Sequence, residues 1–106
     1  MADKLLSALS LCKKAGALAE GFDAVEGALK SGRAALLLFA KDISAGTKKR
    51  AITAKPKSLP ALTLPYEQKD LAILTRRPVG VLAVTNEDLA VLVHKNIAPS
   101  AKEEPV

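Results

Sequence analysis

The sequence has no tryptophan, and its aromatic side chains are limited to Phe22, Phe39 and Tyr66. A packed core must therefore be aliphatic, and the 49% content of hydrophobic residues is enough for one domain in 106 residues. Cysteine is as scarce, because Cys12 stands alone and no disulfide can form within the chain. A lone cysteine is typical of proteins in a reducing compartment, so we expect a cytoplasmic location.

Long apolar stretches are also missing. A transmembrane helix needs about 20 apolar residues in succession, and the apolar run in the N-terminal segment MADKLLSALSLCKKAG is much shorter. The same segment lacks the basic-first layout of a signal peptide. We therefore expect neither a membrane span nor a signal peptide.

Side chains suited to catalysis are few. The only histidine, His94, has no partner at metal-ligand spacing, and Cys12 falls on the apolar face of a predicted helix, as a small core residue would. Asp42 follows a predicted strand, where a carboxylate can be catalytic, but a cap for the next helix is the favoured role. The chain has no P-loop, zinc spacing or dinucleotide fingerprint. We expect no enzyme activity, cofactor or metal, and an enzyme that uses Asp42 is the weakest hypothesis.

Positive charge is in excess, with 16 lysines and arginines against 11 aspartates and glutamates. The resulting net charge of +5 suits nucleic acid or another acidic partner, although many soluble domains are equally basic. Three basic features could converge on one ligand, namely Lys13–Lys14, Lys30 and Arg76–Arg77. Lys48–Lys49–Arg50 forms a separate patch. Each cluster alone is also compatible with a solvated surface.

The hydrophobic pattern alternates between helical and strand periods. It predicts a helix between Asp3 and Gly16, then helices over 22–31, 44–54, 66–74 and 87–95, with Ser44 and Asn86 as caps. It predicts strands over 17–19, 34–40, 61–64 and 79–84. This order indicates an α/β fold, a three-layer α/β/α sandwich with a mixed sheet of about four strands and about five helices. Residues 1–97 form one domain, and residues 98–106 are predicted to be a flexible tail.

The most informative stretch is GFDAVEGALKSGRAALLLFAKD, residues 21–42. Gly21 opens an amphipathic helix, Gly32 ends it, and a wholly apolar strand follows. A helix that starts on a glycine turn leaves backbone N–H groups free to face an anion. Helix starts and strand-end loops of an α/β sandwich share edges, so Gly21 and Arg76–Arg77 are expected to face the same ligand.

Four segments carry a resemblance to a known family: LLSALSLCKKAGALAEGFDAV, ALKSGRAALLLFAKDISAGTKKR, DLA and RRPVGVLAV. Together they resemble the kink-turn RNA-binding ribosomal proteins, the L-seven-Ae and L-thirty-e family, and most closely its small bacterial ribosomal-protein-like branch. The resemblance runs from Leu5 to about Lys95. It implies the α/β/α sandwich, cytoplasmic RNA binding without catalysis, and structured RNA as the partner, with ribosomal RNA as one candidate.

In that family a Gly-x-Asn-Glu segment at the start of the second helix reads sheared G·A pairs, and the loop before the last strand packs against a flipped nucleotide. The resemblance places RNA contacts at these residues: Gly21, Phe22, Asp23, Ala24, Gly27, Lys30, Thr75, Arg76, Arg77, Pro78 and Val79.

Several of these positions depart from the family pattern. The asparagine is replaced by Asp23, the glutamate by Ala24, and a lysine one turn later by Gly27. Glu20 adds a negative charge, and Ala72 stands where glycine is common. A protein-interaction module that has lost specific RNA recognition therefore remains the alternative. The oligomeric state is left open, with a monomer expected.

Overall fold

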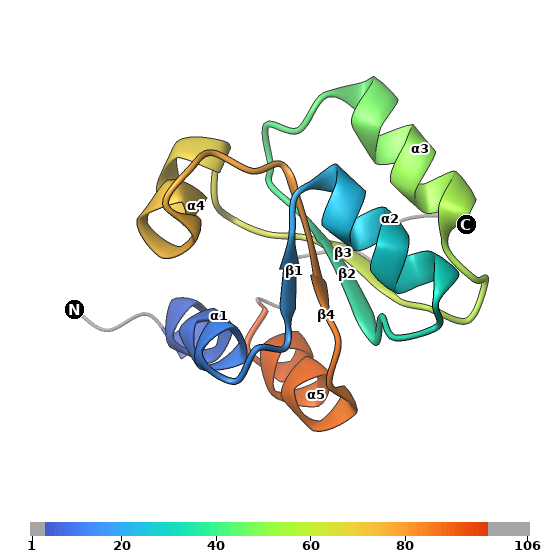
Figure 1. The fold of residues 1–106 in the computed structure, drawn as a ribbon. Helices are drawn as coiled ribbons and strands as arrows, with labels where there is room; N and C mark the ends of the chain where they lie inside the picture. Colours follow the sequence, from blue (N-terminus) through green and yellow to red (C-terminus); the bar gives the residue numbers. More distant parts are fainter. Residues whose placement is uncertain (1–3, 98–106) are drawn as a thin grey trace.

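In the computed structural model, which describes residues 4–97, five helices and four strands alternate along the chain (Figure 1). The helices are α1 (Lys4–Lys14), α2 (Phe22–Lys30), α3 (Ala45–Ala54), α4 (Gln68–Thr75) and α5 (Glu87–Lys95). The strands are β1 (Leu18–Glu20), β2 (Leu36–Phe39), β3 (Ala61–Thr63) and β4 (Val81–Val84). The predicted flexible tail, residues 98–106, lies outside the described residues.

The four strands form one mixed sheet in the order β1-β4-β2-β3. Strand β4 is central and runs antiparallel to both β1 and β2, whereas β2 and β3 are parallel. Strands β2 and β4 are buried along their whole length, as expected for strands that are covered on both faces. The predicted mixed sheet of four strands is confirmed.

Two hydrophobic clusters cover the two faces of the sheet. Helices α1, α4 and α5 pack on one face, against Leu38, Leu64 and Leu82 among others. Helices α2 and α3 pack on the other face, where Phe39 is fully buried with Val25. Alternate side chains of each strand point into opposite clusters, which is the period-2 pattern of a strand. The three-layer α/β/α arrangement is therefore confirmed.

The helix starts follow the predicted chemistry at two positions and differ at a third. Ser44 and Asn86 are N-caps whose side chains accept hydrogen bonds from Thr47 N and Leu89 N. The fourth helix starts at Gln68 rather than at the predicted residue 66. The reason is a capping box, in which the Glu67 and Asp70 side chains reciprocally accept backbone N–H groups.

Strand directions bring four connections to one edge of the sheet. Because β4 is antiparallel to β1 and β2, its start lies beside their ends, and Ala40 N donates to Gly80 O at 2.9 Å. Because β3 is parallel to β2, its end lies at the same edge, where Lys41 N donates to Tyr66 O at 2.8 Å. The starts of α2, α3 and α4 therefore meet the loop before β4. Within residues 4–97, no helix is both long and apolar enough to cross a bilayer.

Candidate nucleic-acid interface

Gly21 and Arg77 lie in contact at this edge. Gly21 N donates to Val81 O at 3.0 Å, which extends the β1–β4 pairing by one residue and fixes the start of α2 beside the loop that precedes β4. A β-carbon placed on Gly21 would be only 3.2 Å from Arg77 Nη2. Arg77 Nη2 also lies 3.5 Å from the carbonyl oxygen of Glu20, a long hydrogen bond. The predicted meeting of Gly21 with the arginine loop is confirmed.

A cleft of about 270 Å³ opens at the same place. It is lined by the starts of three helices and by the loop before β4: Gly21, Phe22, Ile43, Ser44, Thr47, Gln68, Arg77, Pro78, Val79, Gly80 and Val81. The volume falls just below the usual range for drug-sized ligands, about 300–1,000 Å³. It suits one flat group with an apolar wall on one side and a guanidinium at the rim.

The loop before β4 is only partly available for contact. Arg76, Arg77 and Pro78 are exposed, whereas Thr75 is 5% and Val79 is 4% exposed. The Thr75 hydroxyl lies 3.0 Å from Leu71 O and 2.6 Å from Arg77 O, so it holds the turn together. Thr75 is therefore an anchor of the loop rather than a contact residue, which corrects the sequence prediction. Val79 contributes only to the cleft wall.

Arg76 has an unusual backbone. It caps the C-terminus of α4 in the left-handed conformation, with φ 70°, and it is the only described residue other than glycine with a positive φ. Such a position favours glycine, because a β-carbon there crowds the backbone. An exposed arginine at a position that prefers glycine is held there at a cost to stability.

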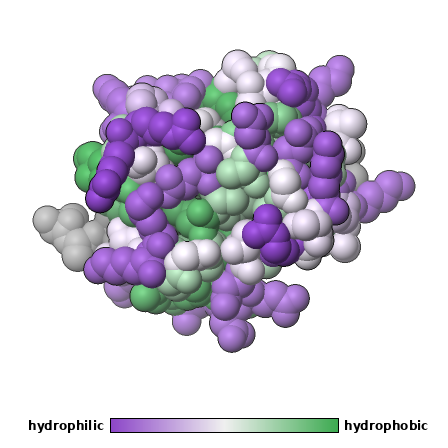
Figure 2. Space-filling model, viewed as in Figure 1, coloured by the Kyte–Doolittle hydropathy of each residue, from purple (hydrophilic) through white to green (hydrophobic). Residues whose placement is uncertain are grey.

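The outer side of α2 offers few polar groups. Asp23, Ala24 and Gly27 are all exposed, but Asp23 alone among them has a polar side chain. Figure 2 accordingly shows paler surface over β1 and α2, with hydrophilic side chains on either side. Lys30 lies in the last turn of the helix, about 13.5 Å from Gly21 by helical rise, and its Nζ is 3.9 Å from Glu26 Oε1. The prediction that Lys30 joins this edge is wrong, because it lies at the far end of α2.

Arg50 connects the basic patch of α3 to α2. Its guanidinium carbon lies 4.2 Å from the centre of the Phe22 ring, a cation–π contact between the first residue of α2 and the middle of α3. The sequence suggested that Lys48, Lys49 and Arg50 form a separate patch. The contact of Arg50 with Phe22 instead joins this patch to the Gly21 edge. Only the packing of α2 against α3 could reveal this.

Two carboxylates near the edge already have partners. Glu20 forms an ion pair with Lys13, so neither charge is free to act alone. Asp42 Oδ1 accepts from Gln68 N at 2.9 Å. Asp42 therefore helps to cap α4. The prediction that it caps the next helix in sequence, α3, is wrong, because Ser44 caps that helix.

Other reactive groups lie elsewhere. Cys12 is fully buried among the side chains under α1, α4 and α5, and this burial raises the pKa of its thiol above the ordinary value. The predicted core role of Cys12 is confirmed. His94 lines a different cavity, of about 470 Å³, beside Glu87 and Val91. Within residues 4–97 no group of three or more His, Cys, Asp or Glu side chains could hold a metal ion.

No family model matches the sequence, and no curated protein matches it. Among solved structures, a protein of unknown function from Bacillus halodurans matches with a TM-score of 0.80 and 21% identity, over 90% of this chain and 97% of that one. A 15.5 kD RNA-binding protein from Giardia lamblia matches with a TM-score of 0.65 and 17% identity, over 88% of this chain and 81% of that one. These likenesses establish that the chain shares their fold.

Proposed function

We propose that this protein is a non-catalytic RNA-binding protein that recognises structured RNA at the edge formed by Gly21, Phe22, Arg76, Arg77 and Pro78. The contact of Arg77 with the glycine-opened start of α2, at the mouth of a cleft, carries this proposal. An arginine fork can bind phosphate or a guanine edge, and the cleft can accept one unstacked base.

The fold supports the same proposal. A structural neighbour from Giardia lamblia is an RNA-binding protein, and it matches 88% of this chain. The net charge of +5 favours a polyanionic partner. We infer that the RNA target is a kink-turn or a related bent element, as the sequence resemblance implies, and that ribosomal RNA is one source of it.

This chain has fewer side-chain groups that could recognise individual bases than the family that its sequence resembles. Asp23 can accept hydrogen bonds but cannot donate them, and Ala24 and Gly27 have no polar side-chain atom. We therefore assign most of the binding energy to Arg76, Arg77 and backbone N–H groups near Gly21. Recognition of this kind depends on the shape and the phosphates of the RNA more than on its bases.

The test is a titration of a synthetic kink-turn RNA at several salt concentrations. The wild-type affinity should fall steeply with salt, because each neutralised phosphate releases a counterion. Arg76→Glu with Arg77→Glu should abolish measurable binding. The matched control, Lys4→Glu with Lys95→Glu, makes the same charge change on exposed residues of α1 and α5 and should have a small effect. Equal losses of RNA affinity in the two double variants would contradict the proposal that RNA binds at this edge.

A second candidate function rests on a different surface. Ile73 is 83% exposed, and it lines a groove of about 390 Å³ between α1 and α4 with Leu6 and Leu74. Exposed apolar side chains around a groove are typical of a protein-interaction site. Capture of a protein partner that survives nuclease treatment, and that is lost in Ile73→Asp, would favour this function over RNA binding.

A further inference from the structure

Residues 43–66 contain no aspartate or glutamate, although they make up 24 of the 106 residues. The same stretch carries five basic residues, which are Lys48, Lys49, Arg50, Lys55 and Lys57. It includes all of α3 and the connection to β3, on the face of the sheet that α2 and α3 cover. This stretch is therefore positive with no acidic residue of its own, and the acidic residues nearest to it in the same layer are Asp23 and Glu26 of α2.

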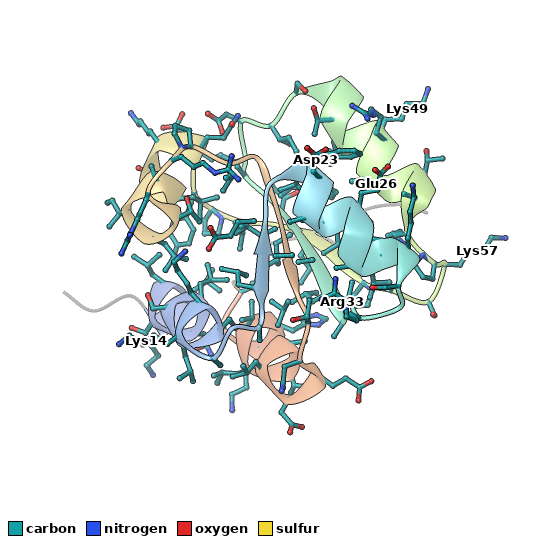
Figure 3. All side chains as sticks on the ribbon, viewed as in Figure 1. Lys14, Asp23, Glu26, Arg33, Lys49 and Lys57 are labelled. Carbon is teal, nitrogen blue, oxygen red and sulfur yellow. The ribbon has the colours of Figure 1, made fainter. Side chains whose placement is uncertain are left out.

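Three of the five basic side chains face solvent. Lys49, Arg50 and Lys57 are exposed, and Figure 3 shows Lys49 and Lys57 projecting outward from the α3 side of the molecule. Lys55 is 7% exposed, and its Nζ donates to Pro56 O at 3.3 Å, so it belongs to the protein interior. Lys48 is half-buried, with its Nζ 5.6 Å from the centre of the Phe39 ring. We call Lys49, Arg50 and Lys57 the α3 surface.

No residue of the α3 surface takes part in an ion pair within residues 4–97, whereas Lys13, Lys30 and Lys69 do. The apolar side chains that are large and exposed lie elsewhere, at Leu11 and Val91 on α1 and α5 and in α4. A surface whose cations form no ion pairs, and which has no large exposed apolar side chain, suits a phosphate backbone better than a folded protein partner.

The α3 surface continues from the candidate interface. Arg50 stacks on Phe22, which lines the cleft, and α3 extends about 15 Å over its 10 residues. The α3 surface is therefore long enough to follow several successive phosphates of one RNA strand.

We propose that the α3 surface binds the phosphate backbone of a double-stranded RNA stem that adjoins the element held at the Gly21–Arg77 edge. This inference rests on the proposed function and names a second contact region for the same RNA. Lysine side chains bind phosphates as mobile point charges, so this contact is independent of the stem's sequence.

The experiment compares two kink-turn RNAs that share the internal loop, one with a long stem of ten base pairs and one trimmed to three. The test variant is Lys49→Gln with Lys57→Gln. The control, Lys4→Gln with Lys95→Gln, removes two charges from exposed positions of the opposite layer. All four lysines are exposed, so none of these changes touches the core.

On the long-stem RNA the test variant should lose about tenfold in affinity or more, and the slope of log affinity against log salt should become shallower by about two. On the trimmed RNA it should bind like the wild type, and the control should bind like the wild type to both. Equal losses of affinity on the two RNAs, or equal losses in the test and control variants, would overturn the proposed contact between the α3 surface and the stem. The proposed function would remain intact. Failure of the wild type to bind either RNA would overturn both.

Discussion

The guanidinium of Arg77 lies 3.2 Å from the position that a β-carbon at Gly21 would take, which is closer than an ordinary van der Waals contact. The two residues are 56 positions apart in the chain, but Gly21 N bonds to Val81 O, and the antiparallel pairing of β1 with β4 brings Arg77 alongside. Gly21 has φ 89° and ψ 162°, a backbone conformation that is almost restricted to glycine. Glycine at position 21 therefore meets two requirements: it adopts the backbone conformation of the turn into α2, and it leaves room for the Arg77 side chain.

Gly21→Ala should destabilise the fold by about 1–3 kcal/mol, because it adds backbone strain and displaces Arg77. Gly27→Ala is the matched control, since Gly27 lies within α2 and a β-carbon there meets nothing within 4 Å. That change should stabilise the protein by about 0.5–1 kcal/mol. Urea unfolding of the two variants measures both effects. A neutral Gly21→Ala would contradict the geometry at the start of α2.

Arg76→Gly should stabilise the fold by about 1 kcal/mol, because glycine adopts the left-handed conformation without strain. The same variant should bind RNA more weakly, because a charged contact is lost. Arg76→Gln separates the two effects, since it keeps the strain and removes only the charge. Thermal unfolding and RNA titration of both variants check the prediction. A stabilised Arg76→Gly with unchanged RNA affinity would assign Arg76 no part in binding.

If the proposed function holds, Gly27→Lys should strengthen RNA binding, because it places a cation on the exposed side of α2. The salt dependence should steepen by about one unit of slope, corresponding to one added phosphate contact. Gly27→Gln controls for the added size and helix propensity without the charge. An affinity gain that is equal in both variants would point to helix stability instead of an RNA contact.

Cys12 should react slowly with thiol reagents in the native protein and quickly after unfolding in urea, because its side chain is fully buried. Burial raises the pKa of Cys12 in the folded state above its ordinary value of 9.0. Above pH 9 the thiol of Cys12 therefore stays protonated in the folded state while it loses its proton in the unfolded state. The contribution of Cys12 to the free energy of unfolding is fully present below pH 9 and is lost as the pH rises through the folded-state pKa. Cys12→Ala should weaken this alkaline loss, which urea unfolding at pH 8 and above measures.

Local structure was largely predictable from the sequence. The caps Ser44 and Asn86, the start of α2 after Gly21 and the buried strand β2 all follow from local chemistry that the sequence displays. The helix boundary at Gln68 was missed because the capping box has Glu67 at the N-cap, where serine or threonine is the common residue.

Spatial relationships were less predictable, because they depend on strand order and on helix packing. The alternation of helices and strands predicted four strands but not their order. The position of β4 next to β1 is what places Arg77 beside Gly21. The alternation offered no means to see that Arg50 stacks on Phe22, that Asp42 caps α4, or that Lys30 lies a helix length away. Thr75 looked like part of an exposed basic loop, and only its two hydrogen bonds show that it is internal.

The central claim is that RNA binds at the edge where Arg77 meets the start of α2. The most direct measurement is an NMR titration of the 15N-labelled protein with kink-turn RNA, which follows every backbone amide. We predict the largest shifts at Gly21, Asp23 and Arg77, with little change in α5. Shifts concentrated in α1 and α5, with the amides of Gly21 and Arg77 unchanged, would contradict the account.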